Sequence, residues 1–340
     1  MVAPAARIAL VCSRMSFSRA AAAALCLAGF IAPGLAADAC LSVESRIDLP
    51  GTAGRIDHLA YDAAGKRLFI AELGNNSVDV LDVATGRAVH RIDGLHEPQG
   101  IAYSPGLDRI YVANGDDGTV QSFKGADYSA AGRIRVGSDA DNIRLDDPAK
   151  RLYVGYGDGA IAVLDAGTLQ HVGEIGLKSH PESFQFSPAD ARLFVNVPGA
   201  REIAVASRTD LRQSESWSVG QSSANYPMAV DAKQGRVLVV FRRPAGISAY
   251  RLKDGKLLAS AAVCADADDV FVDDRLQRTY VICGDGFVDV LDAGLARMAR
   301  VKTTAGARTG LYSPQANRLF VAARAEGENL AQVWVLKPLP

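Results

Sequence analysis

Short runs of alternating hydrophobic and polar residues recur along the chain, and each run begins with a basic residue. The basic residue is followed by apolar residues around an aromatic or β-branched centre. Seven such runs begin at an arginine, namely Arg67, Arg109, Arg151, Arg192, Arg236, Arg278 and Arg318. Successive arginines are 40 to 44 residues apart. A period of this length is typical of a structure built from one repeated supersecondary unit.

Each repeat contains four segments with the period-two alternation of a β-strand. The first segment ends at an acidic residue or Ser, as at 58–62, and the second is the arginine-led run, as at 67–70. The third alternates strictly, as at 78–82, and the fourth is weaker, as at 88–92. Gly, Asp, Asn and Pro separate the segments, as tight turns require. The repeat therefore predicts an all-β fold, a seven-bladed β-propeller with four antiparallel strands per blade.

The number of strands after the last arginine predicts how the ring closes. Only one further strand-like segment, Gln332–Lys337, follows the run at Arg318 before the chain stops at Pro340. The seventh blade would then lack its outer strand and leave an open sheet edge, which promotes aggregation. Val43–Leu49 precedes the first inner strand and has no other place in the repeat. We therefore expect this N-terminal strand to close the last blade.

The first 36 residues have the pattern of a secretory signal peptide. Arg7, Arg14 and Arg19 precede the apolar stretch Ala20–Ala32, and small residues follow near Ala36. This order of basic, apolar and small residues is typical of a cleaved leader, and either Met1 or Met15 fits as its start. We expect an exported, periplasmic protein in which residues 37–340 form a single propeller domain.

The net charge limits the classes of binding partner, and the cysteine content bears on the redox compartment. The formal net charge is −1 and becomes −4 without the three leader arginines, which argues against nucleic-acid binding. No later segment has 18 consecutive apolar residues, so no membrane span is expected. We expect a monomer. Cys264 and Cys283 fall on one face of neighbouring blades and are a candidate disulfide in an oxidising compartment, whereas Cys40 would stay unpaired.

Several repeats carry a motif that resembles a known family. Tyr111-Val112-Ala113-Asn114 with Gly118-Thr119-Val120, preceded by the run from Pro98 to Pro105, resembles the YVTN family of bacterial exported seven-bladed propellers. Segments 152–165 and 280–292 repeat the motif, and the resemblance covers about 44–338. It implies the propeller fold. Related propeller groups include ligand-binding and DNA-binding proteins, lactonases, lyases and quinone-dependent dehydrogenase subunits.

Aligning the inner strands gives two rings of candidate ligand-binding residues at the channel mouth. The first ring consists of Asp57, Gln99, Asp141, Glu182, Tyr226, Asp268 and Arg308, and the second contains His58, Asn142 and Asp269. Several carboxylates with an amide oxygen suit a divalent cation such as Ca²⁺. Acidic residues at these positions also begin turns, and Arg308 would instead suit an anionic group of a ligand.

The loops after the second strands face the same way and add further candidates. These are Glu72, Asn114, Tyr156, Arg242, Cys283 and Arg324. Tyr156 and Tyr226 are candidates for an aromatic wall. His96 and His180 lie in equivalent loops of the second and fourth blades, where they would bind a metal, act as acid and base, or simply pack within the loops.

The absence of any complete catalytic motif in the sequence favours a binding protein rather than an enzyme. The expected partner is a small-molecule ligand or a periplasmic protein bound at the polar mouth. One alternative is a metal-dependent lactonase-like or lyase-like enzyme that uses Asp57, Asp141, Glu182, Asp268 and His58 with Ca²⁺ or Zn²⁺. Another alternative, by analogy with related propellers, is an accessory to a periplasmic quinone or cytochrome redox system.

Overall fold

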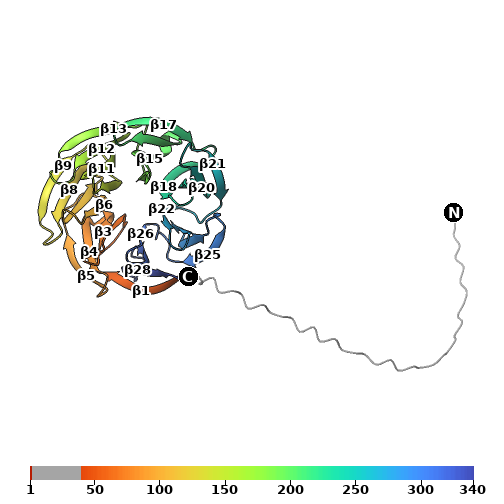
Figure 1. Cartoon of the computed structure of the whole chain (residues 1–340). Helices are drawn as coiled ribbons and strands as arrows, with labels where there is room; N and C mark the ends of the chain where they lie inside the picture. The colour runs from red at the N-terminus through yellow and green to blue at the C-terminus, as the bar shows by residue number, and fades with distance from the viewer. Residues whose placement is uncertain (2–39) are drawn as a thin grey trace, which may run out of the picture. The chain divides into compact units, whose positions relative to one another are not determined.

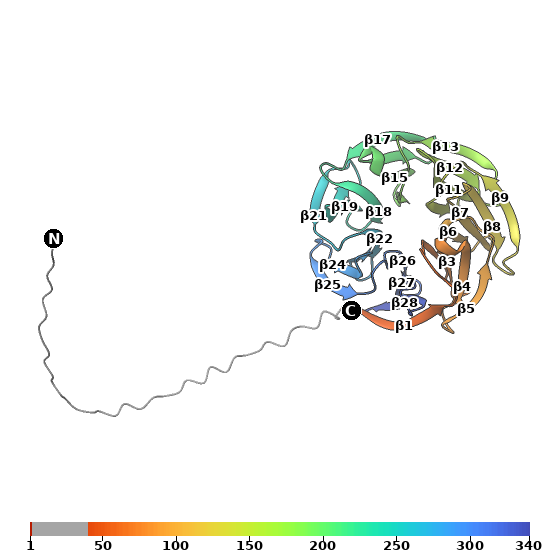
Figure 2. The same ribbon diagram turned by 180° about the vertical axis from the view of Figure 1, so that it is seen from behind.

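The computed structural model describes Met1 and residues 40–340, so the expected signal peptide lies outside the described residues apart from Met1. Residues 40–340 form seven sheets of four antiparallel strands arranged in a ring (Figures 1 and 2). In each sheet the strands follow the chain order from the innermost to the outermost, except in the last blade. The prediction of an all-β, seven-bladed propeller is confirmed.

Blades one to four have regular, short strands. Blade one consists of β2 (Leu59–Asp62), β3 (Arg67–Glu72), β4 (Ser77–Asp82) and β5 (Arg87–Ile92). Blade two consists of β6 (Pro98–Ser104), β7 (Arg109–Asn114), β8 (Thr119–Lys124) and β9 (Ala130–Arg135). Blade three consists of β10 (Ile143–Asp146), β11 (Arg151–Tyr156), β12 (Ala160–Asp165) and β13 (His171–Gly176). Blade four consists of β14 (Phe184–Phe186), β15 (Arg192–Val197), β16 (Glu202–Ser207) and β17 (Arg212–Ser218).

The last three blades complete the ring. Blade five consists of β18 (Ser223–Asp231), β19 (Arg236–Arg243), β20 (Ala245–Arg251) and β21 (Leu257–Ala261). Blade six consists of β22 (Ala267–Asp273), β23 (Arg278–Cys283), β24 (Phe287–Leu291) and β25 (Arg297–Lys302). Blade seven consists of β26 (Gly310–Ser313), β27 (Arg318–Ala323), β28 (Ala331–Pro338) and β1 (Leu41–Leu49). The only helical segments among residues 40–340 are the 3-10 turns η1 (Leu73–Asn75) and η2 (Pro198–Ala200), and no described helix is long enough to cross a membrane.

The N-terminal strand closes the ring as the strand count predicts. β1 pairs antiparallel with β28, with Ile47 opposite Val333 and Leu49 opposite Ala331. The Leu339 amide donates to the Cys40 carbonyl at 2.9 Å, and Arg318 of β27 forms an ion pair with Glu44. Blade seven therefore combines strands from both ends of the described chain, and the pairing covers the edge that β28 would otherwise expose.

The arginines of the repeat include several that stabilise turns within their blades. Arg67 binds the Asp62 carboxylate through Nε at 2.9 Å, and Arg236 binds Asp231 in the same way at 2.9 Å. In both blades the arginine begins the second strand and the aspartate ends the first. These pairs stabilise the hairpin between the two strands. In these blades the arginine of the repeat therefore has a structural role and does not indicate a binding site.

The core lies between neighbouring blades. Aromatic residues from the second strands are completely buried, among them Phe69, Tyr111, Phe194 and Phe320. One cluster contains Ile70 of β3 and Phe320 of β27, which join blade one to blade seven. Burial of apolar surface between every pair of blades contributes most of the stabilisation and leaves the central channel free for polar side chains.

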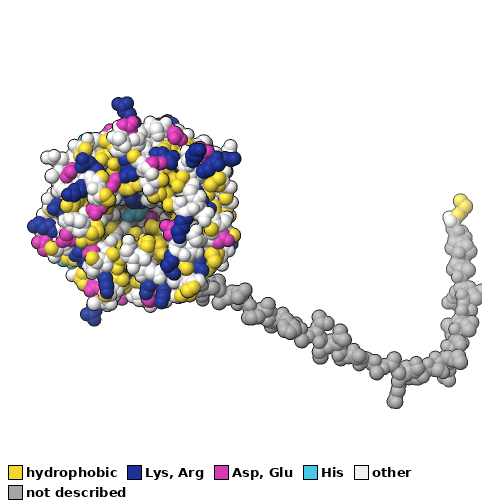
Figure 3. Space-filling view, in the orientation of Figure 1, with side chains coloured by type: hydrophobic (Ala, Val, Ile, Leu, Met, Phe, Trp, Pro, Cys, Tyr) yellow, Lys and Arg dark blue, Asp and Glu magenta, His cyan; other side chains and the backbone are white. Residues whose placement is uncertain are grey.

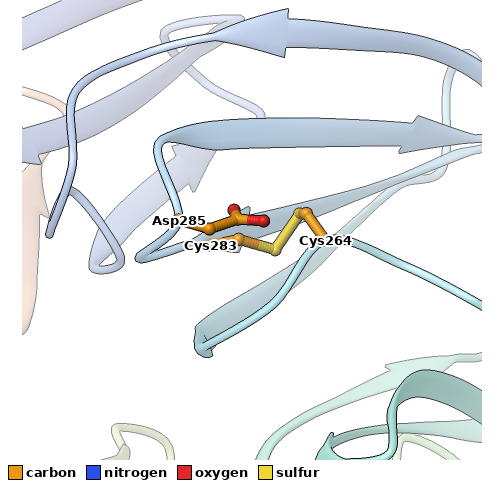
Figure 4. Close-up of side chains that lie close together, drawn as sticks. All are labelled: Cys264, Cys283 and Asp285. Atoms are coloured by element: carbon orange, nitrogen blue, oxygen red, sulfur yellow. A yellow bond between two sulfur atoms is a disulfide. The ribbon is translucent and has the colours of Figure 1, made fainter.

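A disulfide joins Cys264 to Cys283, and their Cα atoms are 5.8 Å apart (Figure 4). Cys264 lies beyond the outer strand β21, in the loop that leads to β22. Cys283 ends β23. The bond therefore ties the blade-five-to-six connection to blade six, and among the described cysteines Cys40 alone is unpaired and is buried.

Candidate binding site at the channel mouth

The structure brings the two predicted rings together at one end of the central channel. We call them the collar, and it comprises Asp57, Gln99, Asp141, Glu182, Tyr226, Asp268 and Arg308 with His58, Gly100, Asn142, Ser183, Pro227, Asp269 and Thr309. Backbone contacts connect neighbouring members: the His58 amide donates to the Gln99 carbonyl and the Ser183 amide to the Tyr226 carbonyl, both at 3.3 Å. In the space-filling view a histidine side chain is visible within the central depression of the ring (Figure 3).

His58 lies at the centre of the collar between carboxylates from two blades. Its Nδ1 is 3.7 Å from Oδ2 of Asp269, and its Nε2 is 3.7 Å from Oδ1 of Asp57. Burial opposes the charged form, but Asp269, followed by Asp57, outweighs burial and raises the pKa of His58 to about 10. The side chain is therefore an imidazolium at neutral pH.

Asn142 completes the surroundings of His58. Its amide group is 3.3 Å from Nε2 of His58. Because the charged ring carries a proton on this nitrogen, it requires an acceptor, and the Asn142 amide presents its oxygen to the ring when His58 is charged. This orientation also gives a partner to the Asn142 oxygen, which is buried and lacks one when the amide nitrogen faces the ring.

A small residue and a backbone hydrogen bond let His58 contact blades three and six. In blade two the equivalent residue is Gly100, where an added Cβ would lie 2.1 Å from the Asp141 carbonyl oxygen. The inner strands of blades two and three therefore approach too closely for a side chain at this position. On the other side Asp269 accepts from the Gly310 amide of blade seven at 2.8 Å, which directs its carboxylate towards His58.

Two arginines share the carboxylate of Asp268. Nη2 of Arg242 lies 2.6 Å from Oδ1, and Nε of Arg308 lies 2.9 Å from Oδ2. The Arg242 guanidinium also lies 4.2 Å from the centre of the Tyr226 ring, within reach of a cation–π interaction. Burial raises the pKa of Asp268 to about 6 although Arg242 opposes the shift. This part of the collar is neutralised internally.

The two loop histidines lie in different surroundings. Nδ1 of His180 is 2.7 Å from the Gly157 carbonyl, and its Nε2 is 3.8 Å from Oδ2 of Asp141. Burial opposes its charge, but the interaction with Asp141 prevails and raises the pKa of His180 to about 9. His96 instead lies within 4 Å of Asp116 and Asp117, outside the collar. The two histidines therefore contact different carboxylates, which favours the alternative that each packs within its own loops.

Glu182 differs from the other acidic side chains of the collar because it has no internal partner. Among residues 40–340 its carboxyl group makes no hydrogen bond and no ion pair, although the residue is half-buried. Burial, together with the nearby charge of Asp141, raises the pKa of Glu182 to about 8. The side chain is thus mostly protonated at neutral pH and offers a hydrogen-bonding group towards the mouth.

An arginine-lined pocket of 160 Å³ adjoins the collar. Arg55, Arg308 and Arg324 line it together with Asp266, and the rest of its wall is mostly Gly and Ala. Arg55 binds Asp57 at 2.8 Å and Arg308 binds Asp266 at 3.1 Å. Among the described residues Arg324 makes no ion pair. The pocket therefore has a surplus of positive charge, which suits an anionic group. Arg55 was not among the residues expected from the sequence.

Three other predicted loop residues serve their own blades. Glu72 accepts from Thr52 at 2.6 Å and from Ser77 at 2.8 Å. Asn114 donates to the Thr119 hydroxyl at 3.2 Å. The Tyr156 hydroxyl binds Glu174 on the outer strand β13, so Tyr156 does not join Tyr226 in an aromatic wall.

The donor groups of the collar do not fit a divalent cation. Asp57, Asp268 and Asp141 already interact with arginine or histidine, whereas Ca²⁺ takes six to eight oxygen ligands. In the described part of the chain the only close group of ligand-type side chains is Cys264, Cys283 and Asp285 (Figure 4). Its two sulfurs are joined in the disulfide, so they offer no thiolate.

A scan against models of known protein families gives no match for this chain, and a search of curated proteins finds none similar to it. The resemblance to the YVTN family therefore rests on the strand and turn motifs alone. The structure itself establishes a seven-bladed β-propeller.

Proposed function

We propose that this protein is an exported, YVTN-like propeller that binds a polar ligand or a polar segment of a protein partner at the collar. The ligand carries a cationic or hydroxyl group that faces Glu182 and an anionic group that occupies the arginine-lined pocket. No catalytic role is assigned to the collar. The observation that carries the proposal is Glu182, a half-buried carboxyl group without an internal partner in a collar whose other carboxylates are mostly paired.

An unpaired acid lowers the stability of the folded protein. The half-buried carboxyl group of Glu182 has lost part of its hydration and gains no hydrogen bond from the protein in return. Asp268, by contrast, is neutralised by Arg242 and Arg308. A group that lowers stability and faces an open mouth is typical of a binding site, where stability is traded for function.

The arginine-lined pocket supports the same proposal, because its positive charge suits the anionic group of the ligand. Burial works against the charge of Arg55, but Asp57 and Asp268 outweigh it and raise the pKa of Arg55. Arg55 thus remains cationic and lines a common pocket with Arg308 and Arg324. A cationic group bound beside Glu182 would favour its ionised form, so a zwitterionic molecule, or a protein segment with neighbouring acidic and basic side chains, would match both Glu182 and the arginines.

A ligand-observed NMR screen tests the proposal. Saturation-transfer spectra are recorded for amino acids, hydroxy acids and amino sugars with the wild-type protein, Glu182→Gln, Arg308→Gln and the control Arg87→Gln. Arg87 is exposed on β5, away from the channel. We expect compounds that bind the wild type and the control but lose their signal with both collar variants. The proposal would be overturned if no compound bound, or if the compounds that bind the wild type bound both collar variants equally well.

A further inference from the structure

Beyond the collar the channel continues into a second cavity of 360 Å³. His58 and Asp269 lie at one end of this channel cavity, and none of the first-ring collar residues lines it. The layer formed by His58 therefore separates it from the mouth. Equivalent positions in six blades, each two residues after the second ring of the collar, contribute to its wall, namely Ala60, Ala102, Arg144, Gln185, Phe271 and Leu311.

Arg144 is the only charged side chain at these equivalent positions of the described inner strands. Its Nη1 donates to the carbonyl of Ile143 at 2.8 Å, and the guanidinium carbon lies 5.7 Å from the centre of the Phe184 ring. Arg144 makes no ion pair with any described carboxylate. Burial lowers its pKa, and Asp269 and Asp141 only partly offset the effect. A guanidinium has five N–H donors, and one backbone acceptor leaves most of them without a partner in the protein.

The rest of the cavity wall consists of one more polar side chain and several apolar side chains. The Gln185 amide donates to the Met228 carbonyl at 3.2 Å and keeps a second N–H for another acceptor. Phe271 and Leu311 are half-buried, so they contact both the blades and the solvent of the channel. The cavity thus presents a cation and an amide donor on one side and apolar side chains on the other.

We infer that the channel cavity is a second binding site, for a small carboxylate with a compact apolar body. The carboxylate accepts two parallel hydrogen bonds from Arg144, and the apolar body packs against Phe271 and Leu311. The volume is at the lower end of the range for small-molecule sites. This site shares His58 and Asp269 with the collar but contains none of its first-ring residues, and it does not depend on the function proposed for the collar.

Calorimetric titration with sodium benzoate tests the inference, and benzamide serves as the neutral ligand of the same shape. Wild-type protein should bind benzoate at least tenfold more tightly than benzamide. Arg144→Gln should lower the affinity for benzoate by about 10–100-fold, the range expected for lost hydrogen bonds to a charged group. The control Arg87→Gln should leave the affinity unchanged. Lack of benzoate binding, equal binding of benzamide, or an unaffected Arg144→Gln variant would overturn the inference.

A second variant keeps the test decisive if Arg144→Gln does not fold. Phe271→Ala removes the apolar wall and leaves the guanidinium in place. This variant should lower the affinity for benzoate clearly more than the affinity for acetate, because acetate has almost no apolar surface that could contact Phe271. Equal effects on benzoate and acetate would contradict the proposed orientation.

Discussion

The charge of His58 depends on a carboxylate from another blade as well as on one from its own. Burial alone would neutralise the imidazole, but Asp57 of its own blade and Asp269 of blade six reverse that effect. The sequence alignment of the repeat placed His58 and Asp269 in one ring. It could not show their contact, because this depends on the direction in which Asp269 is turned by the Gly310 amide.

NMR titration of the imidazole should show that His58 keeps its charge throughout the neutral range. We expect the charged form to persist above pH 8, since the pKa of His58 is raised to about 10. Asp269→Asn removes the strongest stabilising charge and should bring the titration towards the ordinary value. A wild-type His58 that titrates near pH 6.5 would contradict this description of the collar.

Replacement of Glu182 by Gln should stabilise the protein, and more so at high pH. The pKa of Glu182 is about 8 in the folded state, against 4.5 for a free side chain. Its protonation therefore favours folding below pH 4.5, and this contribution is lost as the pH rises towards 8. Urea unfolding at pH 5 and pH 8.5 should show Glu182→Gln gaining about 1–2 kcal/mol over wild type only at the higher pH. A gain of equal size at both pH values would point to a cause other than ionisation.

Arg55 and Arg144 mark the limit of prediction at the residue scale. Arg55 precedes the aligned positions, in a loop whose length differs among the repeats. Arg144 does occupy an aligned position, two residues after the second ring of the collar, but the equivalent residues in other blades are mostly apolar. Whether a single basic side chain in such a ring is paired depends on the blades across the channel, which the repeat does not describe.

At the scale of elements, β1 was predictable because the strands could be counted. Deletion of residues 40–50 removes β1 and leaves β28 with an open edge, so the melting temperature should fall by roughly 10 °C or more. The matched variant Glu44→Gln removes only the exposed ion pair with Arg318, which is worth less than about 1 kcal/mol. If the deletion and Glu44→Gln melted alike, the pairing of β1 with β28 would contribute little.

The disulfide belongs to the same scale, since it connects a loop to a strand. Replacing both Cys264 and Cys283 by Ser should cost about 3 kcal/mol in the free energy of unfolding, as expected for a crosslink between residues 19 apart. Chemical unfolding of the oxidised wild type and the double variant measures this difference. Equal stability would show that the crosslink is dispensable. The sequence could place both cysteines on one face, but not decide whether their side chains point at each other.

At the scale of the whole molecule, the seven blades share one strand pattern but differ in the residues that they place at the channel mouth. The repeat period predicts the number of blades because every blade needs the same strands, turns and arginine-led run. The collar and the channel cavity are formed by positions at which the blades differ, so their chemistry does not follow from the repeat. Function here depends on the differences between blades, whereas the motif that resembles a known family consists of what the blades share.

Hydrogen–deuterium exchange tests the central claim that the collar is the binding surface. The protein is compared with and without a compound identified by the NMR screen, and exchange is followed in peptides from both ends of the channel. We predict that protection is concentrated in the collar segments 55–58, 139–142, 180–183 and 266–269. Protection confined to the turns at the opposite end, such as 63–66, 105–108 and 147–150, would contradict the account.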